Sequence, residues 1–142
     1  MSTGGFEFGR VLVVDDEPIV RYLLEIVLVT DGWHVEQATS GEEALARCKT
    51  ESFDVVILDH WLPGATGLEV AEQLIGDGFR TPIVIFSGFL EPELEVAGRE
   101  IGAEVIDKLN WKELLSFCDA MRYSLTFGRP EFGVHRAKAL GA

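Results

Sequence analysis

The sequence predicts an α/β protein with a doubly wound, five-stranded parallel sheet of strand order 2-1-3-4-5 and helices on both faces. Short apolar runs alternate along the chain with segments whose apolar residues recur every three or four positions, which is typical of strands alternating with helices. The runs at 11–14, 55–58 and 83–86 contain no polar residue, as expected for strands buried on both faces. The run at 33–37 alternates in the manner of a half-exposed strand, so we place it at an edge of the sheet.

The first strand, at residues 10–14, ends in the acidic run Asp15-Asp16-Glu17, and Pro18 then begins a helix that extends to about Asp31. Residues spaced by three and four are assigned to the inward face of this helix, namely Ile19, Leu23, Ile26, Val27 and Thr30. Further apolar residues lie outside that face, namely Tyr22, Leu28 and Val29. Their presence indicates either a surface for a partner or close packing against neighbouring elements.

Two capping boxes are predicted, each with a Ser or Thr followed three residues later by Glu at the start of a helix. Ser40 and Glu43 form the first box. Thr66 and Glu69 form the second, after the apolar strand at 55–58 and the turn that follows it.

The fourth strand ends at Ser87, and the fifth, at 104–107, ends at Lys108. The helix between these strands contains Gly98, which costs roughly 1 kcal/mol relative to alanine. We therefore expect this helix to be the most mobile. Asn110 is predicted to cap the last helix.

A length of 142 residues suits one domain that buries about two-thirds of its unfolded surface. We place this domain at 10–125, between an N-terminal tail at 1–9 and a C-terminal tail at 126–142. The C-terminal tail is too short to fold alone, so we expect no output domain. Cys48 and Cys118 are predicted to be reduced, buried thiols rather than a disulfide or a metal-binding pair.

The chain shows no apolar run near the ~20 residues that span a bilayer, and no basic start followed by an apolar stretch, so we expect a cytoplasmic location. The formal net charge is −12, of which residues 126–142 contribute +2, leaving −14 on the rest. This negative charge on residues 1–125 repels nucleic acid and anionic membranes, so we expect neither as a partner. The basic residues of the tail, Arg129, Arg136 and Lys138, are assigned to a solvated terminus.

Polar side chains converge from four strand ends, because the carboxyl ends of parallel strands meet at one edge of a sheet: Asp15 and Asp16, Asp59, Ser87, and Lys108. Three neighbouring carboxylates stay ionised near neutral pH only when a cation compensates them. Oxygen ligands with room for water favour Mg²⁺, whereas zinc would need a His or Cys, which is missing from these five residues. A carboxylate grouped with Mg²⁺, a lysine and a hydroxyl is typical of a nucleophile in phosphoryl transfer, and we assign that role to Asp59.

This pattern resembles the receiver domain of bacterial two-component response regulators over about residues 10–124. The matching features are an acidic pair after the first strand, an Asp followed by Pro four residues later and Gly eight later, a Ser or Thr after the fourth strand, and a Lys after the fifth. The resemblance implies a flavodoxin-like (βα)5 receiver fold with Asp59 as the phospho-acceptor. It implies Mg²⁺ ligation by Asp16, by Asp15 largely through water, by Asp59 and by the backbone carbonyl of Trp61. It also implies that Ser87 binds a phosphoryl oxygen and that Lys108 pairs with the phosphate.

The chain departs from the family pattern at two positions near Lys108. Leu109 stands where the family typically has Pro, so we expect a trans peptide bond and a shifted loop before the last helix. Val105 stands where the family usually has a Tyr or Phe that swings inward on activation. We therefore expect an altered or weaker switch, in which movement of Ser87 is felt mainly by the loop at 88–92.

Two large apolar residues, Trp61 and Phe89, stand where the family often has polar side chains. We expect them to shield the acyl phosphate from water and to slow its hydrolysis. The alternative for Trp61 is a surface position without effect on the chemistry.

The function that the resemblance implies is that of a single-domain response regulator, not a conventional enzyme. It would accept a phosphoryl group from a sensor histidine kinase or a histidine phosphotransfer protein, and signal to a downstream protein; its oligomeric state is left open. The first alternative is a degenerate receiver that binds proteins without phosphorylation. A phosphatase of the haloacid dehalogenase type would need an Asp at the position of Trp61, and a flavodoxin-like flavin binder would need a phosphate-binding loop in place of Asp15-Asp16-Glu17.

Overall fold

The computed structural model of the protein describes residues 9–127, so the basic tail residues Arg129, Arg136 and Lys138 lie outside the described residues. The parallel strands are β1 (Arg10–Val14), β2 (His34–Ala38), β3 (Val55–Leu58), β4 (Ile83–Ser87) and β5 (Glu104–Asp107). They form one sheet in the order β2-β1-β3-β4-β5, which confirms the predicted fold class and places β2 at an edge.

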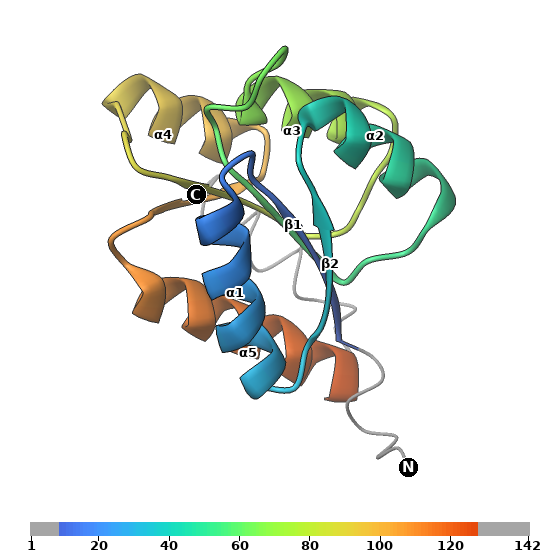
Figure 1. Ribbon diagram of the computed structural model, residues 1–142. Coiled ribbons are helices and arrows are strands. Elements are labelled where there is room, and N and C mark those ends of the chain that lie inside the picture. Colours follow the sequence, from blue (N-terminus) through green and yellow to red (C-terminus); the bar gives the residue numbers. More distant parts are fainter. Residues whose placement is uncertain (1–8, 128–142) are drawn as a thin grey trace.

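The helices are α1 (Pro18–Thr30), α2 (Gly41–Thr50), α3 (Gly67–Gly76), α4 (Pro92–Glu100) and α5 (Trp111–Phe127). Helices α1 and α5 cover one face of the sheet, and α2, α3 and α4 cover the other (Figure 1). Alternate strand residues serve the two faces, so that Leu12 and Ile85 pack with α2 and α3 while Val13 and Phe86 pack with α1 and α5. Among residues 9–127, no helix has the length and apolar character needed to cross a membrane.

Helix α1 buries a different face from the one predicted. Leu24 and Leu28 are buried, whereas Ile19, Leu23 and Ile26 are 60%, 44% and 44% exposed. Thr30, which was also assigned inward, is exposed. The helix is apolar around most of its circumference, so spacing alone does not identify the face that meets the sheet.

The caps follow the sequence with one exception. Thr66 and Glu69 form the complete capping box at α3, and Asn110 Oδ1 accepts from the Glu113 N–H at the start of α5. At α2, Ser40 Oγ accepts from the Glu43 N–H at 3.1 Å, but the Glu43 carboxylate accepts from the backbone N–H of Thr39. Only half of the predicted box at α2 is therefore present.

The two cysteines are free thiols, with Cys118 buried in α5 and Cys48 half-buried in α2. Burial raises the pKa of Cys48 to about 11, so its thiol stays protonated near neutral pH. Cys48 is thus less buried than we expected, but the predicted absence of a disulfide holds.

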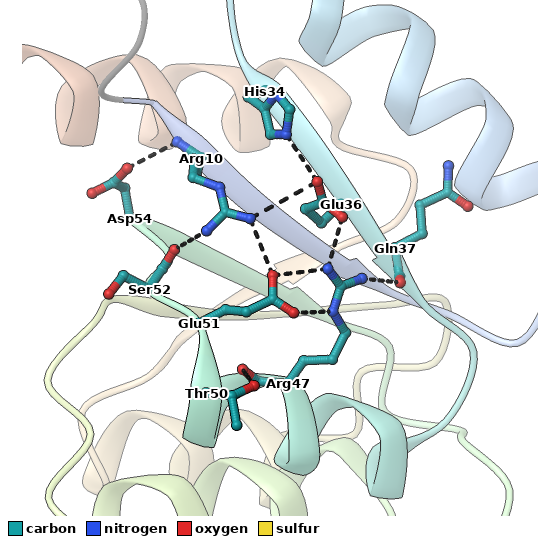
Figure 2. Close-up of polar contacts among 9 residues, drawn as sticks. All are labelled: Arg10, His34, Glu36, Gln37, Arg47, Thr50, Glu51, Ser52 and Asp54. Atoms are coloured by element: carbon teal, nitrogen blue, oxygen red, sulfur yellow. Dashed lines mark hydrogen bonds and ion pairs between the residues drawn. The ribbon is translucent and has the colours of Figure 1, made fainter.

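A network of ion pairs ties the edge strand β2 to α2, near the end of the sheet where β1 and β3 begin (Figure 2). Arg47 contacts Glu36 at 2.7 Å and Glu51 at 2.8 Å, and Arg10 contacts Glu51 at 3.1 Å. Hydrogen bonds from Arg47 and Arg10 lower the pKa of Glu51 to about 2. The Arg10 guanidinium also lies 4.9 Å from the centre of the Phe53 ring. These charges on an exposed edge strand also discourage pairing with another sheet.

Candidate functional site

The acidic residues predicted to converge lie together at the carboxyl ends of β1 and β3. These two strands are neighbours in the sheet, and the Asp59 N–H continues their pairing by donating to the Val14 carbonyl at 2.9 Å. Carboxylate oxygens of Asp15, Asp16 and Asp59 lie within 4.8 Å of one another. Asp15 and Asp59 are buried, at 2% and 5% exposure, whereas Asp16 is exposed.

Lys108 reaches this cluster from the end of β5. Its Nζ lies 2.8 Å from Asp15 Oδ2 and 3.4 Å from Asp59 Oδ1. The Lys108 N–H donates to the Ser87 carbonyl at 2.9 Å, so the pairing of β4 with β5 fixes the start of the side chain. The lysine is therefore placed as predicted.

The loop after Lys108 turns without proline. The Lys108–Leu109 peptide bond is trans, as predicted, and the Leu109 N–H donates to Asp107 Oδ1 at 2.7 Å. Leu109 itself is 91% exposed. Its side chain consequently leaves the approach of Lys108 to the acids unobstructed.

The electrostatics of the cluster favour the binding of a cation. Burial raises the pKa of Asp59, and the charge of Asp15 raises it further against the opposing effect of Lys108. Burial alone would lower the pKa of Lys108, but its contacts with Asp15 and Asp59 outweigh that effect and raise it. One lysine thus faces three carboxylates, and negative charge remains in excess.

Two buried oxygen atoms at the site lack a hydrogen-bond partner among the described residues. They are Asp59 Oδ1, whose contact with Lys108 lacks hydrogen-bond geometry, and Ser87 Oγ at the end of β4. An unsatisfied buried polar atom costs about 1–3 kcal/mol. Oxygen donors around a buried, negatively charged cluster fit Mg²⁺, and an unpaired hydroxyl and a lysine fit the oxygens of a phosphoryl group.

The cluster opens into a cleft of about 560 Å³, lined by Asp16, Glu17, Asp59, Trp61, Gly88, Phe89 and Lys108. Trp61 and Phe89 both line this cleft and are 53% and 74% exposed, and their shielding of an acyl phosphate remains a prediction. Glu17 also lines it, although we assigned it no role from the sequence.

Val105 of β5 does not line the cleft and is buried beneath α4, beside Ile85 of β4. A Cβ at Gly98 would lie 2.6 Å from Val105 Cγ2 and 3.5 Å from Ile85 Cδ1. Gly98 therefore allows α4 to pack directly on β5, which accounts for a glycine inside this helix. The predicted mobility of α4 remains a prediction.

Two residues next to Asp59 in space, Gly67 and His60, were given no role of their own from the sequence. A Cβ at Gly67 would clash with the Asp59 carbonyl oxygen, so only glycine lets the start of α3 approach the site. His60 is 9% exposed, and burial lowers its pKa against the opposing charges of Asp59, Glu69 and Glu91. The glycine belongs to the Asp, Pro and Gly spacing noted above, but no sequence pattern marks the histidine.

The described fold and site agree with comparisons to known proteins. The sequence profile of the response regulator receiver domain matches residues 11–115. The chain is 39% identical over 95 residues to the alkaline phosphatase synthesis transcriptional regulatory protein PhoP of Bacillus subtilis, a match that covers 67% of this chain and 40% of PhoP. This chain therefore spans well under two thirds of the length of that relative.

Solved structures give the same result. Response regulator TrrA of Thermotoga maritima, in complex with Mg²⁺-BeF, superposes with a TM-score of 0.72 at 32% identity, covering 80% of this chain and 98% of TrrA. The receiver domain of Francisella response regulator 1452 superposes with a TM-score of 0.77 at 24% identity, covering 82% of this chain and 98% of that domain, and supports the fold alone. With an acidic cluster, a lysine and a buried hydroxyl at the ends of a five-stranded parallel sheet, this chain belongs to the response regulator receiver domain family.

Proposed function

We propose that this chain accepts a phosphoryl group on Asp59 from the phosphohistidine of a sensor histidine kinase or a histidine phosphotransfer protein, in the cytoplasm. An Asp59 carboxylate oxygen forms a bond to phosphorus as the bond from phosphorus to the donor's imidazole nitrogen breaks, and that electron pair returns to the imidazole. Gain and loss of this group change the receiver's own surface, so the chain is not a conventional enzyme. TrrA, which is similar to this chain, has been crystallised with the histidine kinase ThkA, and this supports a kinase partner.

The observation that carries the proposal is the unbalanced charge around Asp59. Asp59 is buried beside two further acids, and its Oδ1 lies 3.4 Å from Lys108 Nζ but has no hydrogen-bond partner, which is an arrangement suited to a nucleophile. Lys108 and the Ser87 hydroxyl are the groups that would bind phosphoryl oxygens.

Mg²⁺ fits the same oxygen atoms. The ligands would be Asp16 and Asp59, Asp15 largely through water, and the backbone carbonyl of Trp61. When bound, the ion neutralises the carboxylates and the charge on the transferred phosphoryl oxygens.

The output that we propose is binding to a downstream protein by a single-domain regulator. Relatives such as PhoP are transcriptional regulators, but the acidic charge of residues 10–125 disfavours direct contact between this domain and DNA. Because Val105 is buried against α4 and is not aromatic, we assign the readout of phosphorylation to Ser87 and the loop at 88–92.

The test is titration with Mg²⁺ and then beryllofluoride, a phosphoryl mimic, while tryptophan fluorescence is recorded. Trp61 lines the cleft and should respond, and Trp33, which is buried, should contribute a constant background. Phosphorylation by a small acyl phosphate should require Mg²⁺ and be absent in Asp59→Asn. No response to metal together with no phosphorylation would favour the degenerate receiver, which binds proteins without phosphorylation.

A further inference from the structure

His60 directly follows Asp59, and both its buried side chain and its backbone carbonyl accept hydrogen bonds from the segment that leads into α3. Its Nδ1 accepts a hydrogen bond from the Leu68 N–H at 3.3 Å, in the first turn of α3. Its backbone carbonyl accepts from the Gly67 N–H at 2.8 Å and from the Leu62 N–H at 3.1 Å. His60 therefore makes hydrogen bonds both to the start of α3 and to Leu62, at the beginning of the loop between β3 and α3.

The ring of His60 also supports Trp61. The two ring centres are 4.8 Å apart and the planes meet at 79°, which is an edge-to-face arrangement favoured by aromatic quadrupoles. Trp61 is 53% exposed, and among residues 9–127 its aromatic ring contact is with His60. An Nδ1 that accepts a hydrogen bond carries no proton, which leaves the ring N–H on Nε2.

We propose that His60 is a positioning residue whose imidazole has two separable tasks. The Nδ1 atom holds the loop that carries the Trp61 carbonyl, and the ring holds the Trp61 indole at the wall of the cleft. The expected consequences for Mg²⁺ and phosphoryl lifetime rest on the proposed function, whereas the contact between the two rings does not.

Two substitutions separate these tasks. His60→Asn keeps an acceptor, because the Asn side-chain oxygen occupies nearly the place of Nδ1, but removes the ring. His60→Phe keeps a ring beside Trp61 but leaves the Leu68 N–H without its acceptor. The full chain is labelled with 5-fluorotryptophan, and the ¹⁹F resonance of Trp61 is assigned with Trp61→Phe. The resonances of Trp33 and Trp111 report in the same sample whether each variant is folded.

The expected result is a reciprocal pattern. In His60→Asn the Trp61 resonance shifts toward that of solvent-exposed indole, while Mg²⁺ affinity stays within about twofold of wild type. In His60→Phe the Trp61 resonance stays near its original position, while Mg²⁺ affinity falls by roughly tenfold, the lower end of the effect of disturbing the groups that support a metal site. Phosphoryl loss should be faster in His60→Asn, and this increase should vanish when Trp61 is already Ala.

An unchanged Trp61 resonance in His60→Asn, with the Trp33 and Trp111 resonances intact, would overturn the proposal, as would wild-type Mg²⁺ affinity in His60→Phe. If the wild-type chain neither binds Mg²⁺ nor accepts phosphoryl, the proposed function fails, and the Trp61 resonance in His60→Asn still decides whether His60 positions the indole.

Discussion

Lys108 Nζ lies closer to Asp15 Oδ2, at 2.8 Å, than to Asp59 Oδ1, at 3.4 Å. Lys108 therefore contacts Asp15 more closely than it contacts Asp59, the proposed phospho-acceptor. Asp15 and Asp59 are among the residues that would hold Mg²⁺, and Lys108, which contacts both, would also bind phosphoryl oxygens, so metal and phosphoryl binding should be coupled through this side chain.

Replacing Lys108 by Met should lower stability in the absence of Mg²⁺ by about 1–2 kcal/mol, because two largely buried carboxylates lose their cation. Mg²⁺ should restore more stability to this variant than it adds to the wild type. Urea unfolding with and without Mg²⁺ measures both effects. Lys112→Met, an exposed position in α5, is the matched control and should change little. Equal Mg²⁺ stabilisation of Lys108→Met and wild type would contradict this account.

Asp59→Asn should stabilise the metal-free protein by about 1 kcal/mol, or a Tm rise of about 3–5 °C. The pKa of Asp59 is raised by burial and by Asp15, so the folded state holds this proton more tightly than the unfolded chain does. Stability from Asp59 is therefore present below the ordinary carboxyl pKa near 4, and it is lost as pH rises through the raised folded value. Melting scans from pH 4 to 8 should show a growing gain for Asp59→Asn, and none for the exposed Glu72→Gln. A gain independent of pH would show that charge is not the cause.

Trp61→Asn and Phe89→Glu should each speed loss of the phosphoryl group a few-fold, or on the order of 0.5–1 kcal/mol in the barrier, if these side chains shield the acyl phosphate. Decay of the phosphorylated protein after removal of the donor measures this rate. Val96→Asn replaces an exposed apolar residue of α4 that does not line the cleft, and it should decay as wild type does. If phosphoryl loss in both cleft variants were as slow as in the wild type, Trp61 and Phe89 would be surface residues that do not shield the acyl phosphate.

Gly67→Ala should destabilise the protein by about 1–3 kcal/mol and weaken Mg²⁺ binding, because its Cβ would push the start of α3 away from the Asp59 carbonyl. Gly76→Ala, at the other end of the same helix, meets no atom within 4 Å and should be neutral or stabilising by up to about 1 kcal/mol. Urea unfolding and metal titration of the two variants compare them directly. Similar behaviour of both would exclude the clash as the cause.

The sequence predicted the site residues that are placed by their position at a strand end. It did not predict features that depend on contacts between elements distant in the chain. Asp15 and Asp59 each follow an apolar run and Lys108 follows the strand at 104–107, and parallel pairing brings the ends of such strands together. The prediction of the buried face of α1 was wrong because apolar residues surround this helix. Which of them are buried depends on how the helix packs on the sheet. The hydrogen bond between His60 and Leu68 forms where the chain folds back at α3, and no spacing of residues in the sequence predicts it.

The close packing of α4 on β5 over Gly98 also limits how this receiver can change in evolution. An aromatic side chain at position 105 would need volume that the contact between Gly98 and Val105 does not leave. An aromatic residue at position 105 could therefore be accommodated only if α4 moved away from β5 earlier or at the same time. A larger residue at position 98 would leave still less space for it. Positions 98 and 105 should consequently vary together among descendants of this chain, with small residues at one accompanying bulk at the other.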